Sequence, residues 1–167
     1  MPSLNSPLYE KPLTITKPTT IKVFPVFGNG IPGNIDSLEV YKVPTLKAET
    51  NLPELKNGLK YSYYEGTWDM LPDFEKLTPL KSDITPDLEM QERSTDLNFA
   101  IRYTGYIDIQ EDNIYTFNLI SDDGSRLLID GTQVVNNDGL HASIEKSGKA
   151  SLKKGKHKIE ILFFQKG

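Results

Sequence analysis

The sequence contains no cysteine, a single tryptophan and only two histidines among its 167 residues. Without cysteine, the chain forms no disulfide bond and no thiolate metal site. The missing cysteine does not identify a compartment, since many exported bacterial proteins also lack it. No stretch approaches the roughly 20 apolar residues that a membrane-spanning helix needs, so we expect no membrane span.

The chain also lacks a large net charge: its formal net charge is -4, and its basic residues form no stripe. Nucleic acid is therefore not an expected partner. Residues 1–6 lack both the basic region and the apolar core of a signal peptide. We therefore expect the chain to be a piece of a longer precursor. Its length fits either one domain or one domain with a smaller companion.

Alternation of apolar and polar residues is the main pattern of the chain. A period of two is typical of strands with one buried face. It is clearest in four segments, residues 100–109, 113–120, 144–152 and 158–164. Only residues 85–91 fit a short helix, with Thr85 as its cap and Pro86 in its first turn. The sequence therefore predicts an all-β fold with no more than a turn or two of helix.

The run from Ser121 to Gly131, Ser-Asp-Asp-Gly-Ser-Arg-Leu-Leu-Ile-Asp-Gly, is the most informative stretch. Its last two residues favour a tight hairpin turn, because both central residues of such a turn need positive φ. If the flanking strands pair, the following oxygen-rich loop returns to the start of the run. Five oxygen-bearing side chains then converge at one end of the hairpin: Asp122, Asp123, Asn136, Asn137 and Asp138.

Five motifs in order resemble the protective-antigen domain family, a β-sandwich module of toxins, yeast adhesins and many bacterial glycoside hydrolases. They are residues 58–68 (GLKYSYYEGTW), 71–74 (LPDF), 103–107 (YTGYI), 122–131 (DDGSRLLIDG) and 155–159 (GKHKI). The resemblance covers roughly two thirds of the chain. It implies a protective-antigen-type β-sandwich over residues 58–167.

Residues 1–43 predict a separate, smaller β piece, with short strands at residues 13–15, 20–27 and 38–43. Three such strands bury too little apolar surface to be stable alone. This region resembles the C-terminal immunoglobulin-like module of chitobiases and β-hexosaminidases, without the first strands of that module. Residues 44–57 contain two prolines and no clear period, so we expect a linker there.

The resemblance also implies a calcium site. In the adhesin branch of the family, adjacent aspartates and a nearby asparagine hold a calcium ion that contacts sugar hydroxyls. Calcium takes about six to eight oxygen ligands in loosely constrained geometry. The expected metal ligands here are Asp122, Asp123, Asn137 and Asp138, and the expected carbohydrate-binding residues are Asp122, Asp123, Asn136 and Asn137. The alternative is a turn in which the aspartates accept backbone N–H bonds.

Four neighbouring aromatic residues, Tyr61, Tyr63, Tyr64 and Trp68, are of types that stack on sugar rings. Strand alternation places Tyr61 and Tyr63 on one face and Tyr64 on the other, so they cannot all serve one platform. We expect these residues to be core or strand-pair aromatics instead.

No catalytic residue is predicted. Ser121 or Ser125 with His141 supplies the residue types of a nucleophile and a base, but the nucleophile-elbow pattern is missing. We expect His141 and His157 at surface or turn positions.

These observations favour a non-catalytic carbohydrate-binding module of an exported bacterial glycoside hydrolase, a β-hexosaminidase or α-fucosidase. The expected partners are a glycan and the catalytic domain of the same parent protein, at a secreted, periplasmic or cell-surface location. The first alternative is a structural spacer that binds no glycan. An enzyme in its own right comes third, because no nucleophile and base can be paired. An open face bearing Asp122 and Asp123 favours binding, and burial of that face favours the spacer.

Overall fold

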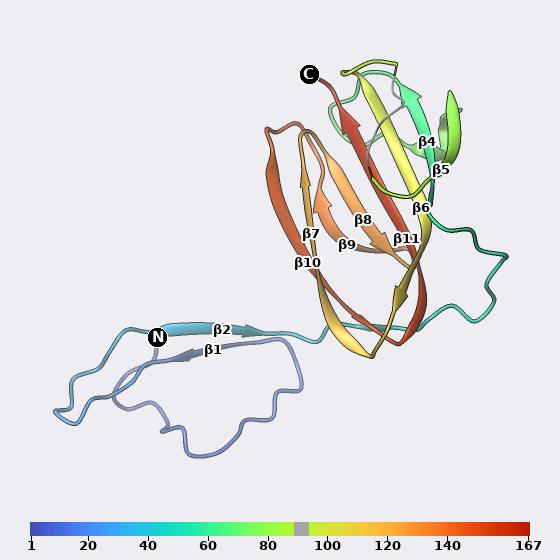
Figure 1. Ribbon diagram of the computed structural model, residues 1–167. Helices are drawn as coiled ribbons and strands as arrows, with labels where there is room; N and C mark the ends of the chain where they lie inside the picture. The colour runs from blue at the N-terminus through green and yellow to red at the C-terminus, as the bar shows by residue number, and fades with distance from the viewer. Residues whose placement is uncertain (89–93) are drawn as a thin grey trace. The chain divides into compact units, whose positions relative to one another are not determined.

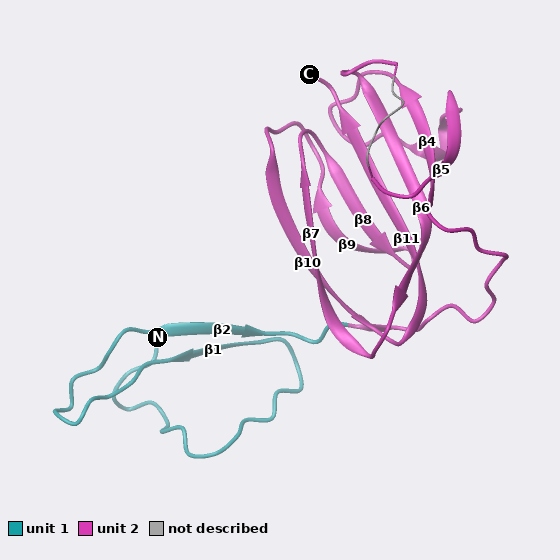
Figure 2. Ribbon diagram, in the orientation of Figure 1, with its two compact units in different colours: residues 1–43 teal, residues 44–167 magenta. Residues whose placement is uncertain are grey.

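The computed structural model describes residues 1–88 and 94–167, which form two compact units, residues 1–43 and 44–167 (Figure 2). The all-β prediction is confirmed, and the one helical element in the described ranges is the 3-10 turn η1 (Phe74–Lys76). The helix predicted for residues 85–91 lies partly outside the described residues, and its expected cap Thr85 ends strand β5 (Lys81–Thr85). No helix of the described part is long and apolar enough to cross a membrane.

Unit 1 contains one antiparallel pair of strands, β1 (Thr19–Val23) and β2 (Asp36–Val40) (Figure 1). The register sets Ile21 opposite Leu38, so these apolar side chains share one face of the pair. That face is largely exposed, since Leu38 is 62% accessible to solvent. The strand predicted for residues 13–15 is wrong, because no described segment of unit 1 pairs with these residues.

Unit 2 is a sandwich of a three-stranded sheet and a six-stranded sheet (Figure 1). The smaller sheet has the order β3-β10-β7, and the larger has the order β5-β4-β6-β11-β8-β9. Their remaining bounds are β3 (Thr45–Leu46), β4 (Leu59–Glu65), β6 (Phe99–Ile109), β7 (Asn113–Ser121), β8 (Ser125–Ile129), β9 (Thr132–Asn137), β10 (Ile144–Leu152) and β11 (Gly155–Gln165). Strand β3 lies within the segment predicted as a linker and pairs in parallel with β10, so part of that segment belongs to the sheet.

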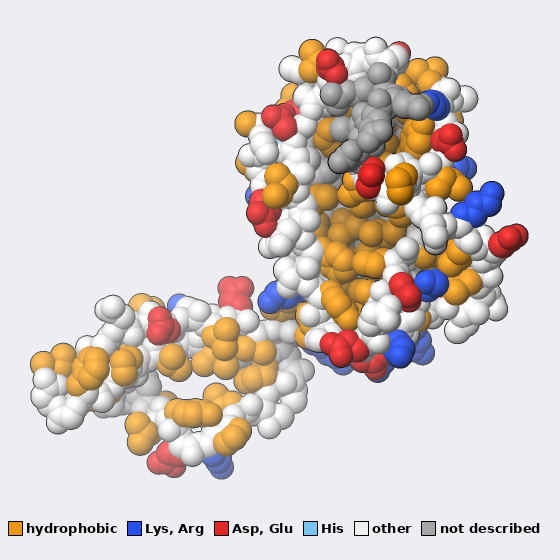
Figure 3. All heavy atoms as spheres, viewed as in Figure 1, with side chains coloured by type: hydrophobic (Ala, Val, Ile, Leu, Met, Phe, Trp, Pro, Cys, Tyr) orange, Lys and Arg blue, Asp and Glu red, His pale blue; other side chains and the backbone are white. Residues whose placement is uncertain are grey.

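The six-stranded sheet buries apolar side chains on both faces. Toward the smaller sheet, Ile109 of β6 packs with Leu127 of β8 and Leu152 of β10. The opposite face packs Ala100 and Phe164 against the segment that follows β4. The three strands of the smaller sheet cover only part of the six-stranded sheet. Figure 3 shows apolar side chains gathered on one face of unit 2.

The tyrosines of β4 lie on the faces that alternation predicted, with Tyr63 and Tyr64 buried and Tyr61 half-buried beside Tyr63. Tyr63 stacks beside Phe99, with 5.9 Å between ring centroids, while Tyr64 packs on the other face of the sheet. Trp68 lies against Gly66, where an added Cβ would stand 2.6 Å from the indole ring. These contacts make the aromatic residues part of the packing of unit 2, as expected from the sequence.

Connections between the two sheets gather at the ends of the sandwich. Strands β7 and β10 are antiparallel, with Ser121 opposite Ile144. Residues 122–124 and residues 138–143, which both carry the chain between sheets, therefore lie at the same end. The predicted hairpin turn is confirmed, because Asp130 and Gly131 have φ of 49° and 74°.

His157 is fully buried, so its expected surface position is wrong. The period of β11 places it on the face that carries Ile159 and Ile161, although lysines flank it in the sequence. Its Nδ1 lies 2.6 Å from Oδ2 of Asp130, and its Nε2 lies 2.8 Å from the carbonyl oxygen of Lys153. The imidazole therefore joins the β8–β9 turn to the β10–β11 turn.

Replacing His157 with leucine is expected to lower the free energy of unfolding by about 3 kcal/mol, because the Asp130 carboxylate and the Lys153 carbonyl lose their partner. Urea unfolding of the full chain measures this. Lys158→Leu, an exposed neighbour on the same strand, is the control and should change stability by less than about 0.5 kcal/mol. Equal effects of the two substitutions would contradict a linking role for His157.

Candidate functional site

The buried carboxylate of Asp123 ties together two segments at the end of the sandwich. Only 8% of this residue is exposed. Its Oδ1 accepts the backbone N–H of His141 at 3.2 Å, and its Oδ2 accepts the backbone N–H of Lys166 at 2.9 Å. Burial of a carboxylate is costly unless such donors replace water. Asp123 therefore fastens residues 138–143 and the end of β11 to the β7–β8 connection.

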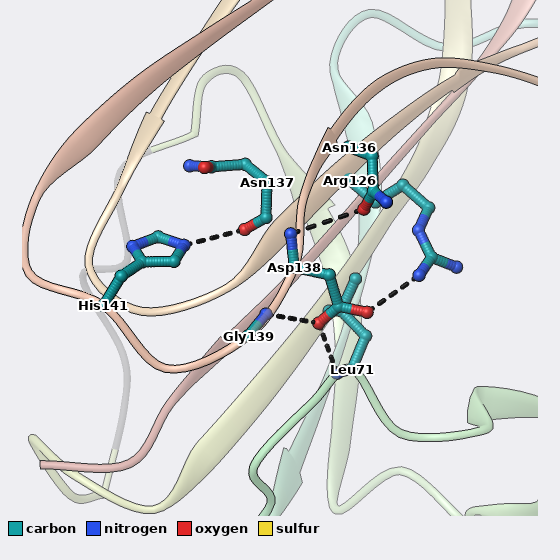
Figure 4. A network of polar contacts seen from close by, with 7 residues as sticks. All are labelled: Leu71, Arg126, Asn136, Asn137, Asp138, Gly139 and His141. Atoms are coloured by element: carbon teal, nitrogen blue, oxygen red, sulfur yellow. Dashed lines mark hydrogen bonds and ion pairs between the residues drawn. The ribbon is translucent and has the colours of Figure 1, made fainter.

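A second carboxylate, that of Asp138, ties two further segments to the same loop (Figure 4). Its Oδ1 accepts the backbone N–H groups of Leu71 at 2.8 Å and Gly139 at 2.9 Å. Its Oδ2 pairs with the guanidinium of Arg126 at 2.8 Å. The Asp138 side chain is only 5% exposed, and both lone pairs of Oδ1 are in use. The network leaves Asp138 little capacity for a metal ion.

Close backbone packing and an ion pair complete this end of unit 2. A Cβ added at Gly124 would stand 2.8 Å from the backbone nitrogen of Gly139, so the two loops touch there. The ammonium of Lys166 lies 2.5 Å from a carboxylate oxygen of Asp69. Residues 69–71, 122–124, 138–141 and 166 are therefore held together.

The remaining predicted site residues differ in their surroundings. Asp122 is exposed and is joined to Asp123 by a cis peptide bond. Asn136 is exposed, and its Oδ1 accepts the backbone N–H of Asp138 at 3.4 Å. Asn137 is buried and donates to Oγ of Ser121, but within the described part of the chain its own Oδ1 has no partner. The structure thus offers one exposed carboxylate and one unpaired buried oxygen.

His141 is half-buried beside the aspartate pair and carries a raised pKa. The main cause is the carbonyl oxygen of Asn137, 2.9 Å from Nε2, which accepts a proton from the ring. The carbonyl oxygen of Ala142, 2.9 Å from Nδ1, and the negative charges of Asp123 and Asp122 raise the pKa further, while burial opposes them. A carbonyl oxygen can only accept, so this geometry favours the protonated imidazole.

These contacts leave no catalytic triad at the candidate site. Both ring nitrogens of His141 face backbone carbonyls, and the hydroxyl of Ser121 lies 2.6 Å from that of Ser125. Across residues 1–88 and 94–167, no three His, Cys, Asp or Glu side chains form a ready metal cluster.

The sequence pattern did not reveal four residues of these networks: Asp69, Leu71, Arg126 and Lys166. Their partners lie 97, 67, 12 and 43 residues away along the chain, respectively. Leu71 and Lys166 take part through their backbone N–H groups. Every residue except proline has such a group, so the residue type gives no signal for this role. Arg126 gave a weak signal, as a charged residue in the strand that follows the two aspartates.

Residues 55–167 match the family model of the PA14 domain. Among curated proteins, the anti-sigma-I factor RsgI3 of Acetivibrio thermocellus is 26% identical over 115 residues, which cover 65% of this chain. The aligned part is 17% of that relative, so the chain spans well under two thirds of its length.

Solved structures show the same sandwich. An anti-sigma factor domain-containing protein, 26% identical, matches with a TM-score of 0.55 over 66% of this chain and 39% of that chain. A PA14 sugar-binding domain from an RTX adhesin, 19% identical, matches with a TM-score of 0.54 over 66% of this chain and 84% of that domain. The predicted protective-antigen-type fold is thereby confirmed, while the likeness of residues 1–43 to a chitobiase module stays a prediction.

The His141 imidazole should titrate above its ordinary pKa of roughly 6.5. Because folding raises this pKa, the stabilisation that the protonated His141 imidazole gives the fold is complete below about pH 6.5. That stabilisation is lost as the pH rises through the folded-state pKa. An NMR titration of the ring protons, assigned by their loss in His141→Gln, measures the midpoint. Asp122→Asn should lower that midpoint by removing a negative charge, and a wild-type midpoint at or below 6.5 would contradict this geometry.

Asp138→Ala should lower the free energy of unfolding by about 2 to 3 kcal/mol, because it leaves the Leu71 and Gly139 N–H groups and the Arg126 guanidinium without their acceptor. Asp138→Asn keeps a carbonyl-type oxygen and should cost about 1 kcal/mol. Asp122→Ala, at the exposed carboxylate, is the control for urea unfolding. A result within 0.5 kcal/mol of wild type for Asp138→Ala would refute the tethering role.

Proposed function

The chain belongs to the PA14 domain family, and we propose that unit 2 is a carbohydrate-binding module without catalytic activity of its own. The PA14 domain is a binding-type domain, and the adhesin domain of the same fold is described as sugar-binding. We propose that the sugar binds at the end of the sandwich that carries Asp122 and Asp123.

The observation that carries this proposal is the placement of Asp122. Its carboxylate is exposed, yet the neighbouring Asp123 is fixed by two backbone N–H groups from segments distant in sequence. A carboxylate held on such a fixed support can accept hydrogen bonds from vicinal sugar hydroxyls without losing much conformational entropy on binding. This arrangement suits a polyol better than an apolar ligand.

We further propose that calcium assists this site, bound by Asp122, Asp123 and Asn137. Calcium prefers carboxylate and amide oxygens. Within residues 1–88 and 94–167, the buried Oδ1 of Asn137 has no partner and fits this donor set. Each Asp123 oxygen accepts one hydrogen bond from those residues, which leaves a lone pair. When bound, calcium would supply a positive charge that sugar hydroxyls can approach.

The other two predicted site residues receive different roles in this proposal. Asp138 holds the loop, because Arg126 and two backbone N–H groups occupy its oxygens. Asn136 is exposed beside that loop and is available to donate a hydrogen bond to a bound sugar. The proposed metal set therefore excludes Asp138, and Asn136 belongs to the proposed sugar contacts.

A structural spacer remains the alternative function. Burial of Asp123 by backbone donors agrees with the interpretation of the aspartates as structural residues. Exposure of Asp122 favours binding, since a spacer has no need for an unshielded carboxylate next to a buried one. Binding is therefore the function that we put first.

The parent protein is proposed in two forms. The likeness of residues 1–43 to a chitobiase module favours an exported glycoside hydrolase, with a catalytic domain as partner. The relatives with 26% identity are anti-sigma factors and favour a regulatory parent. In both forms we propose that unit 2 meets its glycan at a secreted, periplasmic or cell-surface location.

A printed glycan array tests the function directly. The array is read once with about 1 to 5 mM calcium, roughly the range that weak extracellular calcium sites need, and once with a chelator. Wild-type protein should bind a subset of glycans, and calcium should strengthen that binding. Asp122→Asn should abolish calcium heat in calorimetry and weaken glycan binding at least about tenfold, a loss of about 1.4 kcal/mol. Its melting temperature should stay at the wild-type value, because Asp122 is exposed.

Asp36→Asn removes the same charge at an exposed position of unit 1 and is the matched control. It should behave as wild type in all three measurements. An array without any bound glycan, in either condition, would leave the spacer as the better account. Glycan binding that is identical with and without calcium would remove calcium from the proposal and keep the sugar site.

A further inference from the structure

We infer that Met70 and Leu140 form an apolar contact surface for the sugar ring beside Asp122, an inference that rests on the proposed function. Both side chains are exposed, Met70 at 61% and Leu140 at 51%. Single exposed apolar side chains are ordinary on a protein surface, so what distinguishes these two is how their backbones are held.

Leu140 is held between two residues that the buried carboxylates fasten. The preceding residue, Gly139, donates its N–H to Asp138, and the following residue, His141, donates its N–H to Asp123. The backbone of Leu140 is thus fixed on both sides, while its side chain stays in solvent.

Met70 is bracketed in the same way. The carboxylate of Asp69 pairs with the ammonium of Lys166, and the backbone N–H of Lys166 donates to Asp123. On the other side, Leu71 donates its backbone N–H to Asp138. Asp138 therefore holds one flank of Met70 directly, and the exposed Asp69–Lys166 ion pair links the other flank to the residue whose backbone Asp123 holds. This shared fastening places both apolar side chains at the end of the sandwich that carries Asp122.

Sugar-binding sites combine polar groups for the hydroxyls with an apolar surface for the C–H face of the ring. Tyr63 and Tyr64 are buried, while Tyr61 and Trp68 are half-buried and pack on the core clusters, so these aromatic residues offer little free ring surface. Among the described residues, Met70 and Leu140 are exposed apolar side chains that lie between backbone positions held by the network. Thioether and isobutyl groups adapt to ring shape, so this surface would select for an accessible C–H face and leave hydroxyl selectivity to Asp122 and Asn136.

The test uses the full chain and the printed glycan array, in calcium, for wild type, Met70→Ser, Leu140→Ser and the double variant. Every glycan bound by wild type should require about tenfold more double variant for half-saturation, and about threefold more of each single variant, because apolar contact area is lost. Ile114→Ser, 56% exposed at the far end of β7, is the matched control and should bind as wild type.

Calorimetric calcium titration and the melting temperature should be the same in the double variant and in wild type, which separates lost sugar contact from lost structure. In NMR, the ¹³C-methyl signal of Met70, assigned by its loss in Met70→Ser, should shift on addition of the best-bound oligosaccharide. Wild-type affinity in the double variant, or an unmoved Met70 signal, would overturn this inference and leave the proposed function standing. An array with no glycan bound by wild type would overturn both.

Discussion

Hydrogen bonds from backbone N–H groups to two buried carboxylates, those of Asp123 and Asp138, determine the end of the sandwich on which the proposed site depends. A carboxylate removed from water is destabilised by several kcal/mol unless donors replace its hydration shell. Here the donors come from loops, so satisfying the carboxylates also fixes the loops. Asp123 binds the N–H groups of His141 and Lys166, and Asp138 binds that of Leu71.

This constraint explains how irregular segments can form a defined surface. Residues 69–71 and 138–141 lie outside the strands and make no sheet ladder of their own. Their attachment to Asp123 and Asp138 replaces the ladder and lowers the entropy that ligand binding would otherwise cost. The exposed Asp122 carboxylate is thereby presented on a fixed frame, as the proposed recognition of a sugar requires.

Local sequence patterns predicted the strands and the hairpin turn that carry this site. Period-two alternation predicted β6, β7, β10 and β11, and the Asp130-Gly131 turn predicted that β9 would return Asn137 to the aspartate pair. Alternation did not predict β3, which lies in the expected linker, or β5. The donors to the two carboxylates were not predictable, because Leu71 is 67 residues from Asp138 in sequence and contributes only a backbone N–H. Burial of His157 was missed because the predicted strand began at residue 158, whereas β11 begins at Gly155 and its period places His157 on the inner face.

Amide hydrogen exchange of the full chain tests the central claim most directly, because it reports on the individual N–H groups that the carboxylates accept. The account predicts that the amides of Leu71, His141 and Lys166 exchange far more slowly than an unprotected loop amide of the same sequence. It also predicts that Asp123→Ala releases His141 and Lys166 while Leu71 stays protected. Exchange of these three amides in wild type at the rate of free loop amides would contradict the account.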